Sequence, residues 1–403
     1  MGVSELRPSS EPVPSSPDWA NLFPEVLTLI AKRLSAADYA RFSAVCTSWA
    51  SVASPENGMP GPLALRRGQP YLLFSGDGVG DCEQSDFCTL FDFLDDSFRR
   101  IRPLPEIRGK WLVGSQFGWL AVVDELANPS LLNPFTRTQI ELPPITTVPD
   151  VDPVYDSEGS LVGYNREEEY YPLELCRVPL VISKIVLSSA PTAGDFGAVA
   201  IGPSGLLMFA RPGERKWNLW DICRLYAVVD VIYRDGVFLA VNNMGDVYAI
   251  DLASPSSSLK VSLVAKGYGD YHDTRYLLDS SGVLLHILCK RIPPGELRYR
   301  TCKIEIRSLD PETSTWLPVT SLGDRSLFIG SWCSMSLQAG EISWLKENRV
   351  YFTEDFWAVL PFSKEVVRDI GMFNLNTGNF EACYPPEMRL KWPPPIWITA
   401  PQF

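Results

Sequence analysis

AVVDVIYRDG (227–236), VFLAVNN (237–243), DVYAIDL (246–252) and LKVSLVA (259–265) are four short segments that follow one another in the chain. Each is rich in β-branched and apolar residues, and Gly, Asp, Asn or Ser residues separate it from the next. Segments this short and this regularly interrupted do not suit amphipathic helices. They predict one four-stranded antiparallel unit, and the rest of the chain can be interpreted by comparison with it.

The same arrangement recurs over residues 70–384, where six such units can be aligned. These 315 residues give 52.5 per unit (315/6), close to the roughly 40–50 residues of a propeller blade. The third strand of a unit often runs into a turn that contains Asp, Asn or Pro, as at Asn133–Pro134 and Asp310. In the last unit, LFIGSWCSMSL (327–337) is interpreted as the first strand.

The first unit, which begins at YLLFSGDG (71–78), is one strand short. The segment PIWITAPQF (395–403) is aromatic and β-prone, so we expect it to pair with YLLFSGDG and close the ring. The sequence therefore predicts a mainly β protein. A six-bladed β-propeller over 70–403, closed by the C-terminal strand, follows a small N-terminal helical domain.

One insertion interrupts the repeat at residues 145–176, between the second and third units. Between Asp150 and Tyr171 it holds seven acidic residues against the single Arg166. An acidic loop of this length favours a solvated, disordered segment. The alternative is a docking site for a basic partner.

The N-terminal part has a different character. Residues 1–17 carry four prolines among Ser and Glu and predict a disordered tail. Residues 18–55 place apolar side chains at helical spacing, with Pro24 suited to a first helical position. Gly and Pro then mark 56–69 as a linker. A helical package of this size buries little surface alone and needs a partner.

Composition excludes several classes of protein. The net charge of −12, from 36 Lys and Arg against 48 Asp and Glu, disfavours nucleic-acid binding. Neither a secretory signal nor an apolar run long enough for a membrane span is present. Nine cysteines without a C-x-x-C pair indicate reduced thiols, so we expect a cytoplasmic and/or nuclear protein.

The sequence also lacks the motifs of common catalytic sites. No P-loop, G-x-S-x-G or H-E-x-x-H occurs, and two histidines give little material for a zinc site. His272 lies near Asp270 and Asp273 in a segment that suits a turn, and His286 lies in an apolar strand as a satisfied core histidine. We expect a non-catalytic protein without cofactor or metal.

Two resemblances give these features a function. LFPEVL (22–27) and VCTSWASVAS (45–54) resemble an F-box, although Phe23 stands where Leu is usual before the proline. LLNPFTRTQIELPP (131–144), IGMFNLNTGNFEACYP (370–385) and WPPPIWITAPQF (392–403) resemble a kelch-like domain of unknown function that follows the F-box in many plant proteins.

The resemblance implies a substrate receptor of an SCF-type ubiquitin ligase. The F-box would dock a Skp adaptor, and through it a cullin-RING ligase, while the propeller binds an unknown protein target for ubiquitination and proteasomal degradation. Helix-in-groove docking uses a few apolar anchors at helical spacing. We assign this role to Leu22, Pro24, Val26, Leu27, Ile30, Leu34 and Val45, and the packing between helices to Phe42 and Trp49.

Two other functions stay open on the sequence. One is a propeller enzyme or small-ligand sensor that uses an axial pocket. The other is a non-degradative scaffold that binds the adaptor but presents no target for ubiquitination.

Overall fold

A computed structural model describes the chain in two compact units, residues 1–64 and 65–403. The division falls inside the predicted linker 56–69. The predicted tail 1–17, Leu34 and His272 lie outside the described residues. The described residues are 19–31, 42, 44–53, 68–75, 88–100, 104–134, 136–166, 169–173, 182–191, 194–220, 227–251, 260–271, 273–292, 300–353, 369–381, 384 and 395–399.

The first unit is helical. It contains the single-turn helix η1 (Trp19–Asn21), α1 (Pro24–Ala31) and α3 (Thr47–Val52). Pro24 occupies the first position of α1, as predicted, where its missing N–H leaves no hydrogen bond unmade. Phe42 and Trp49 pack together with ring centroids 4.5 Å apart, and the Trp49 Nε1–H donates to the carbonyl of Trp19 at 2.9 Å. The expected packing role of these two aromatics is confirmed.

The second unit contains six blade sheets, which we number along the chain. Blade 1 has the strand order β28 (Ile396–Thr399), β1 (Pro70–Ser75), β2 (Cys88–Asp92), β3 (Ser97–Arg100). Blade 2 has β4 (Trp111–Gln116), β5 (Trp119–Val123), β6 (Pro129–Leu132), β7 (Gln139–Glu141). Blade 3 has β11 (Lys184–Leu187), β12 (Ala198–Ile201), β13 (Leu207–Ala210), β14 (Asn218–Trp220).

The second half of the ring follows the same plan. Blade 4 has β15 (Val228–Arg234), β16 (Val237–Asn242), β17 (Val247–Asp251), β18 (Lys260–Ala265). Blade 5 has β19 (Thr274–Ser280), β20 (Val283–Ile292), β21 (Arg300–Asp310), β22 (Thr315–Pro318). Blade 6 has the order β24 (Met335–Gln338), β23 (Arg325–Ile329), β25 (Arg349–Phe352), β26 (Gly371–Asn374), β27 (Asn379–Glu381).

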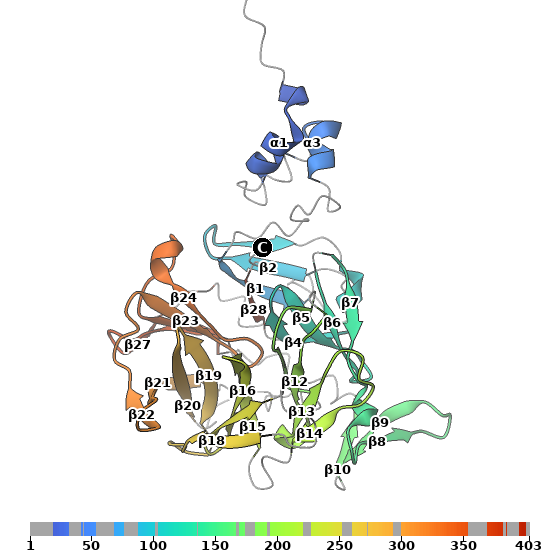
Figure 1. The fold of residues 1–403 in the computed structure, drawn as a ribbon, viewed down its shortest axis with the longest axis vertical. Coiled ribbons are helices and arrows are strands. Elements are labelled where there is room, and N and C mark those ends of the chain that lie inside the picture. Colours follow the sequence, from blue (N-terminus) through green and yellow to red (C-terminus); the bar gives the residue numbers. More distant parts are fainter. Residues whose placement is uncertain are drawn as a thin grey trace, which may run out of the picture. The chain divides into compact units, whose positions relative to one another are not determined.

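These sheets form a six-bladed β-propeller, which confirms the predicted fold. Their inner strands meet in the order β28, β4, β11, β15, β19 and β24, so each blade contacts the next (Figure 1). The first three strands of blade 3 are buried on both sides because neighbouring blades cover both faces of the sheet. Outer strands such as β7 and β22 are largely exposed. This explains why the inner segments read as continuous apolar runs.

The ring is closed as the sequence predicts. β28 pairs antiparallel with β1, and Trp397 lies opposite Leu72. Trp397 is fully buried, and its Nε1–H donates to the carbonyl of Ile329 in blade 6 at 3.1 Å. The C-terminal strand therefore completes blade 1 and also joins it to blade 6.

The recurring polar turn before the outermost strand of a blade has a physical role. In blades 1, 2, 5 and 6 the side-chain oxygen of an Asp or Asn accepts the N–H of a residue two or three positions further on, at 3.0–3.1 Å. This Asx turn ends one strand and starts the return to the outermost strand. The residues are Asp92, Asn133, Asp310 and Asn374.

Blade 6 departs from the prediction, because 327–337 is not one strand. The chain turns after Ile329, so β23 and β24 form a hairpin and β23 then pairs in parallel with β25. At Gly330 the backbone passes close to the Thr353 side chain, because a Cβ added to Gly330 would lie 2.5 Å from Thr353 Oγ1. The result is a five-stranded sheet.

The acidic insertion is also more ordered than predicted. After the short helix η5 (Ile145–Thr147) it forms a three-stranded antiparallel sheet of β8 (Asp152–Tyr155), β9 (Leu161–Arg166) and β10 (Glu169–Pro172). The interpretation as a disordered loop is wrong for these strands. Leu161, Val162 and Tyr164 give β9 the apolar and aromatic content of a strand, but the high charge count of the insertion outweighed this signal. We call this element the insertion sheet.

Candidate functional site

An apolar surface on the helical unit is the first candidate site. Val26 and Leu29 lie three residues apart on α1, which places them on one side of the helix. Val45, just before α3, is 56% exposed, and Phe23 is 74% exposed. A package this small therefore leaves large apolar side chains uncovered within its own unit, as expected of a surface that binds another chain.

Leu27 does not belong to this surface. Its side chain is 1% exposed and packs with Ala31, Phe42 and Val52 in the core of the helical unit. The assignment of Leu27 as an anchor is corrected, because a buried side chain cannot contact a partner unless the unit rearranges. Helical spacing alone could not separate the inner face of α1 from its outer face.

The remaining predicted anchors divide between core and surface. Leu22 and Ile30 are partly buried against the helical core, whereas Pro24 and Val26 are exposed. Leu34 lies outside the described residues. Phe23 and Leu29 are exposed but were not predicted. Leu29 was detectable from its i+3 spacing to Val26.

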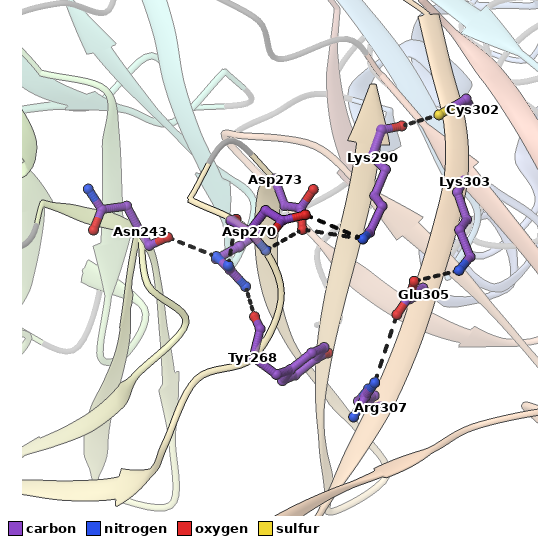
Figure 2. Close-up of polar contacts among 10 residues, drawn as sticks. Asn243, Tyr268, Asp270, Asp273, Lys290, Cys302, Lys303, Glu305 and Arg307 are labelled. Atoms are coloured by element: carbon purple, nitrogen blue, oxygen red, sulfur yellow. Dashed lines mark hydrogen bonds and ion pairs between the residues drawn. The ribbon is translucent and has the colours of Figure 1, made fainter. Parts of the chain in front are cut away.

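The second candidate lies on the propeller, at the end of the blades where loops join the second and third strands. We call this end the loop face. There the buried Arg275 guanidinium donates to the carbonyls of Asn243, Tyr268 and Asp270 at 3.2, 2.7 and 2.9 Å. It fastens the loop between blades 4 and 5 to the 242–246 turn, and the acceptor residues are labelled in Figure 2.

Charged side chains beside Arg275 neutralise one another. Lys290 Nζ lies 3.8 Å from Asp270 and 4.0 Å from Asp273, and the Arg307 guanidinium lies 4.1 Å from the centre of the Tyr268 ring (Figure 2). The hydrogen bond from Lys303 to Glu305 at 2.7 Å lowers the pKa of that carboxyl. Because these groups are partners of each other, the cluster serves to hold strands and loops in place.

His286 lies under this cluster, completely buried between the rings of Tyr268 and Trp316 at centroid distances of 4.9 and 5.0 Å. Neither imidazole nitrogen has a hydrogen-bond partner among the described residues. The core position is confirmed, but the expectation of a satisfied histidine is wrong. Burial, aided by the positive charges of Arg275 and Arg307, lowers its pKa to about 3, so the ring is neutral at pH 7.

We expect His286→Phe to reduce the loss of stability on acidification by about 2 kcal/mol between pH 7 and pH 5. The unfolded histidine, with a pKa near 6.5, binds a proton in this range, whereas the folded one does not. The wild type therefore keeps its full stability above pH 6.5 and loses it as the pH falls. Urea unfolding at both pH values measures the effect, and identical pH dependence of the two proteins would contradict it.

Metal and thiol chemistry find no support in the described part of the chain. There, no three His, Cys, Asp or Glu side chains gather in a way that could hold a metal ion. The cysteines that can be placed are free, and burial raises the pKa of Cys88 and Cys289 to about 12. Such thiols stay protonated and unreactive at neutral pH.

No described helix combines the length and apolar character needed to span a bilayer.

Comparison with known proteins agrees with this architecture. The profile of the KIB1-4 beta-propeller family matches residues 90–374, more than half of the chain, and the F-box domain profile matches residues 19–57. The chain belongs to the KIB1-4 β-propeller family. The F-box ahead of its propeller gives it the domain organisation of an SCF substrate adaptor, in which the F-box binds a Skp adaptor.

Relatives with both parts occur in Arabidopsis thaliana. F-box protein SKIP23 is 28% identical over 95% of this chain and 96% of its own length. F-box protein KIB4 is 23% identical over 82% of this chain and 80% of its own length. F-box proteins of this kind are typically non-catalytic adaptors.

A buried ion pair holds three blades of this KIB1-4 propeller together. Lys184 of β11 and Asp230 of β15 lie 2.5 Å apart, and both are almost completely buried. The Asp230 carboxylate also accepts the N–H groups of Val231 and of Leu277, the latter in β19, at 2.8 and 2.7 Å. Burial raises the pKa of Asp230, and these three donors partly offset that effect.

Proposed function

We propose that this protein is a target-binding subunit of an SCF-type ubiquitin ligase. Its helical unit docks a Skp adaptor, and its propeller holds a protein that other subunits ubiquitinate for proteasomal degradation. The observation that carries the proposal is the exposed apolar surface of Phe23, Val26, Leu29 and Val45 on an F-box unit. We place the complex in the cytoplasm and/or nucleus.

The proposed contribution of this chain is binding and positioning. Ubiquitin transfer then depends on proximity, because a target held near the ligase is presented at a high effective concentration. The mutual pairing of charged side chains on the loop face supports this division of labour. The propeller surface is where we expect specificity for the target to lie.

We expect Val26→Asp and Val45→Asp each to weaken pull-down of a Skp adaptor at least tenfold. A carboxylate placed on an apolar docking surface must be desolvated without a partner. Both side chains are exposed, so the helical unit should stay folded, which circular dichroism checks. Leu27→Asp would lose the adaptor too, but through unfolding of the core that contains Leu27.

Val283→Asp is the matched control. Val283 lies in the propeller with 44% of its side chain exposed, close to the 39% of Val26. The Val283→Asp variant should bind the adaptor as the wild type does. Unchanged adaptor binding by both F-box variants would contradict the proposed docking surface. Proximity labelling with and without a proteasome inhibitor then tests degradation. If bound targets are degraded, the labelled proteins should accumulate only when the proteasome is blocked.

A further inference from the structure

The outer face of the insertion sheet presents one row of side chains across all three strands. Asp152 of β8 and Tyr170 of β10 both lie opposite Asn165 of β9. All three side chains are exposed. Because successive residues of a strand point to opposite faces, this row lies on the other side of the sheet from Tyr164.

The inner face attaches the sheet to the loop face of the propeller. Tyr164 is buried, and its hydroxyl donates to the carbonyl of Leu126 in the 124–128 loop of blade 2 at 2.6 Å. Arg166 Nη1 donates to the carbonyl of Pro203 in blade 3 at 3.4 Å. The sheet therefore spans two blades and exposes its outer face; Figure 1 shows it as a separate sheet beside blade 3.

The ring of Tyr170 is held in a fixed position on this outer face. A Cβ added to Gly163 would lie 2.6 Å from Tyr170 Cε2, so the ring lies across the glycine. The Tyr170 hydroxyl donates to the carbonyl of Val162 at 3.0 Å. Half of the side chain stays exposed. Only a glycine leaves room for this arrangement, which presents an aromatic surface that a ligand can contact without reordering it.

The charge around this ring is negative. Asp152, Asp156 and Glu158 are exposed in β8 and the turn that follows it, and the one arginine of the sheet, Arg166, donates to the propeller from the inner side. A fixed aromatic ring near a carboxylate is the chemistry that binds guanidinium and ammonium groups, through cation–π contact and charge-assisted hydrogen bonds. Charge complementarity therefore selects a basic ligand.

The edges of the sheet are less suited to binding. Each edge strand contains a proline, Pro153 in β8 and Pro172 in β10, and proline has no N–H to donate to an added strand. A ligand would therefore lie on the face. In an extended peptide, alternate side chains point the same way roughly 7 Å apart, so every second residue would face the sheet.

We propose that the outer face of the insertion sheet binds an extended segment of a partner protein that is rich in Arg or Lys. Tyr170 stacks against one cation, and Asp152 accepts hydrogen bonds from a second. The inference rests on the proposed function only in assigning the segment to the ubiquitination target, since the binding itself requires no ligase subunit.

The test is fluorescence anisotropy with the full-length protein and labelled twelve-residue peptides of alternating Arg and Ser, Lys and Ser, or Glu and Ser. We expect the two basic peptides to bind at least tenfold more tightly than the acidic one, and to be released by salt. Tyr170→Leu should weaken binding of the Arg peptide about threefold to fivefold, whereas Tyr170→Phe, which keeps the ring, should stay within twofold.

Asp152→Lys should weaken binding of the Arg peptide about tenfold. Glu312→Lys is the matched control, since it makes the same charge change at an exposed turn of blade 5 and should stay within twofold. Equal loss of affinity in Asp152→Lys and Glu312→Lys would show that only the net charge matters, and would overturn the site. Equal affinity of the wild type for the Arg and Glu peptides would also overturn it, and so would wild-type affinity of Tyr170→Leu for the Arg peptide. Thermal unfolding confirms that each variant is folded. Because the assay contains no adaptor, its failure is distinct from failure of the adaptor pull-down.

Discussion

Trp397→Ala should lower the free energy of unfolding of the propeller by about 4 kcal/mol, as expected when a fully buried tryptophan is truncated. Trp397 packs between Phe93 and Phe328, with ring centroids 5.8 and 4.9 Å away, and hydrogen-bonds the backbone of blade 6. The substitution leaves a cavity where the first and last blades meet. Urea unfolding followed by tryptophan fluorescence and circular dichroism measures the change.

Two other tryptophan variants sharpen this test. Trp397→Phe keeps most of the packing and loses the hydrogen bond to Ile329, so it should cost only about 1–2 kcal/mol. Trp316→Ala truncates a partly exposed tryptophan in the outer strand of blade 5, which plays no part in closing the propeller. It should lower the free energy of unfolding less than Trp397→Ala does. Equal destabilisation by the two alanine variants would show that the closing strand has no special role. Hydrogen exchange should also show faster opening of β1 in Trp397→Ala.

Lys184→Met should destabilise the propeller by about 3–5 kcal/mol at pH 7, the cost of leaving one member of a buried ion pair without its partner. Methionine fills similar space but cannot neutralise Asp230. The loss should shrink towards pH 5. Burial raises the folded pKa of Asp230 above its unfolded value, so protonation at low pH favours the folded state, and the advantage is lost as the pH rises.

A double-mutant cycle separates the pair from its surroundings. Asp230→Asn alone leaves the Lys184 ammonium buried without a carboxylate and should cost a similar amount. Lys184→Met combined with Asp230→Asn should cost clearly less than the sum of the two. Lys266→Met is the control. Lys266 Nζ lies 3.1 Å from the Asp246 carboxylate, but this lysine is mostly exposed, so the substitution should lower the free energy of unfolding by less than about 1 kcal/mol. Additive single losses would contradict the coupling.

Much of the propeller was predictable because each strand carries its own local signal. The short apolar strands within 227–251, the turn at Asp310 and the β-prone residues 396–399 depend on nearby residues, and the structure confirms each of them. The ring closure was predictable as well, since the first unit lacks one strand and a free strand remains at the end of the chain.

Features that depend on distant neighbours were harder to predict. The burial of Leu27 depends on Phe42 and Val52, which the spacing within α1 cannot indicate. The turn after β23 brings Gly330 against Thr353, a residue far along the chain whose position the local sequence does not indicate. Charge was a poor guide in the insertion, where Tyr164 anchors a folded sheet despite the surrounding acidic residues.

The pairing of β28 with β1 also constrains how the chain is made. The two strands are separated by about 320 residues (396 − 75 = 321), so during synthesis β1 leaves the ribosome long before its partner. Until then a nascent chain carries an apolar β1 with an unpaired backbone edge, which is prone to aggregation. We therefore expect messages with a late premature stop codon to yield products that chaperones retain or proteases remove.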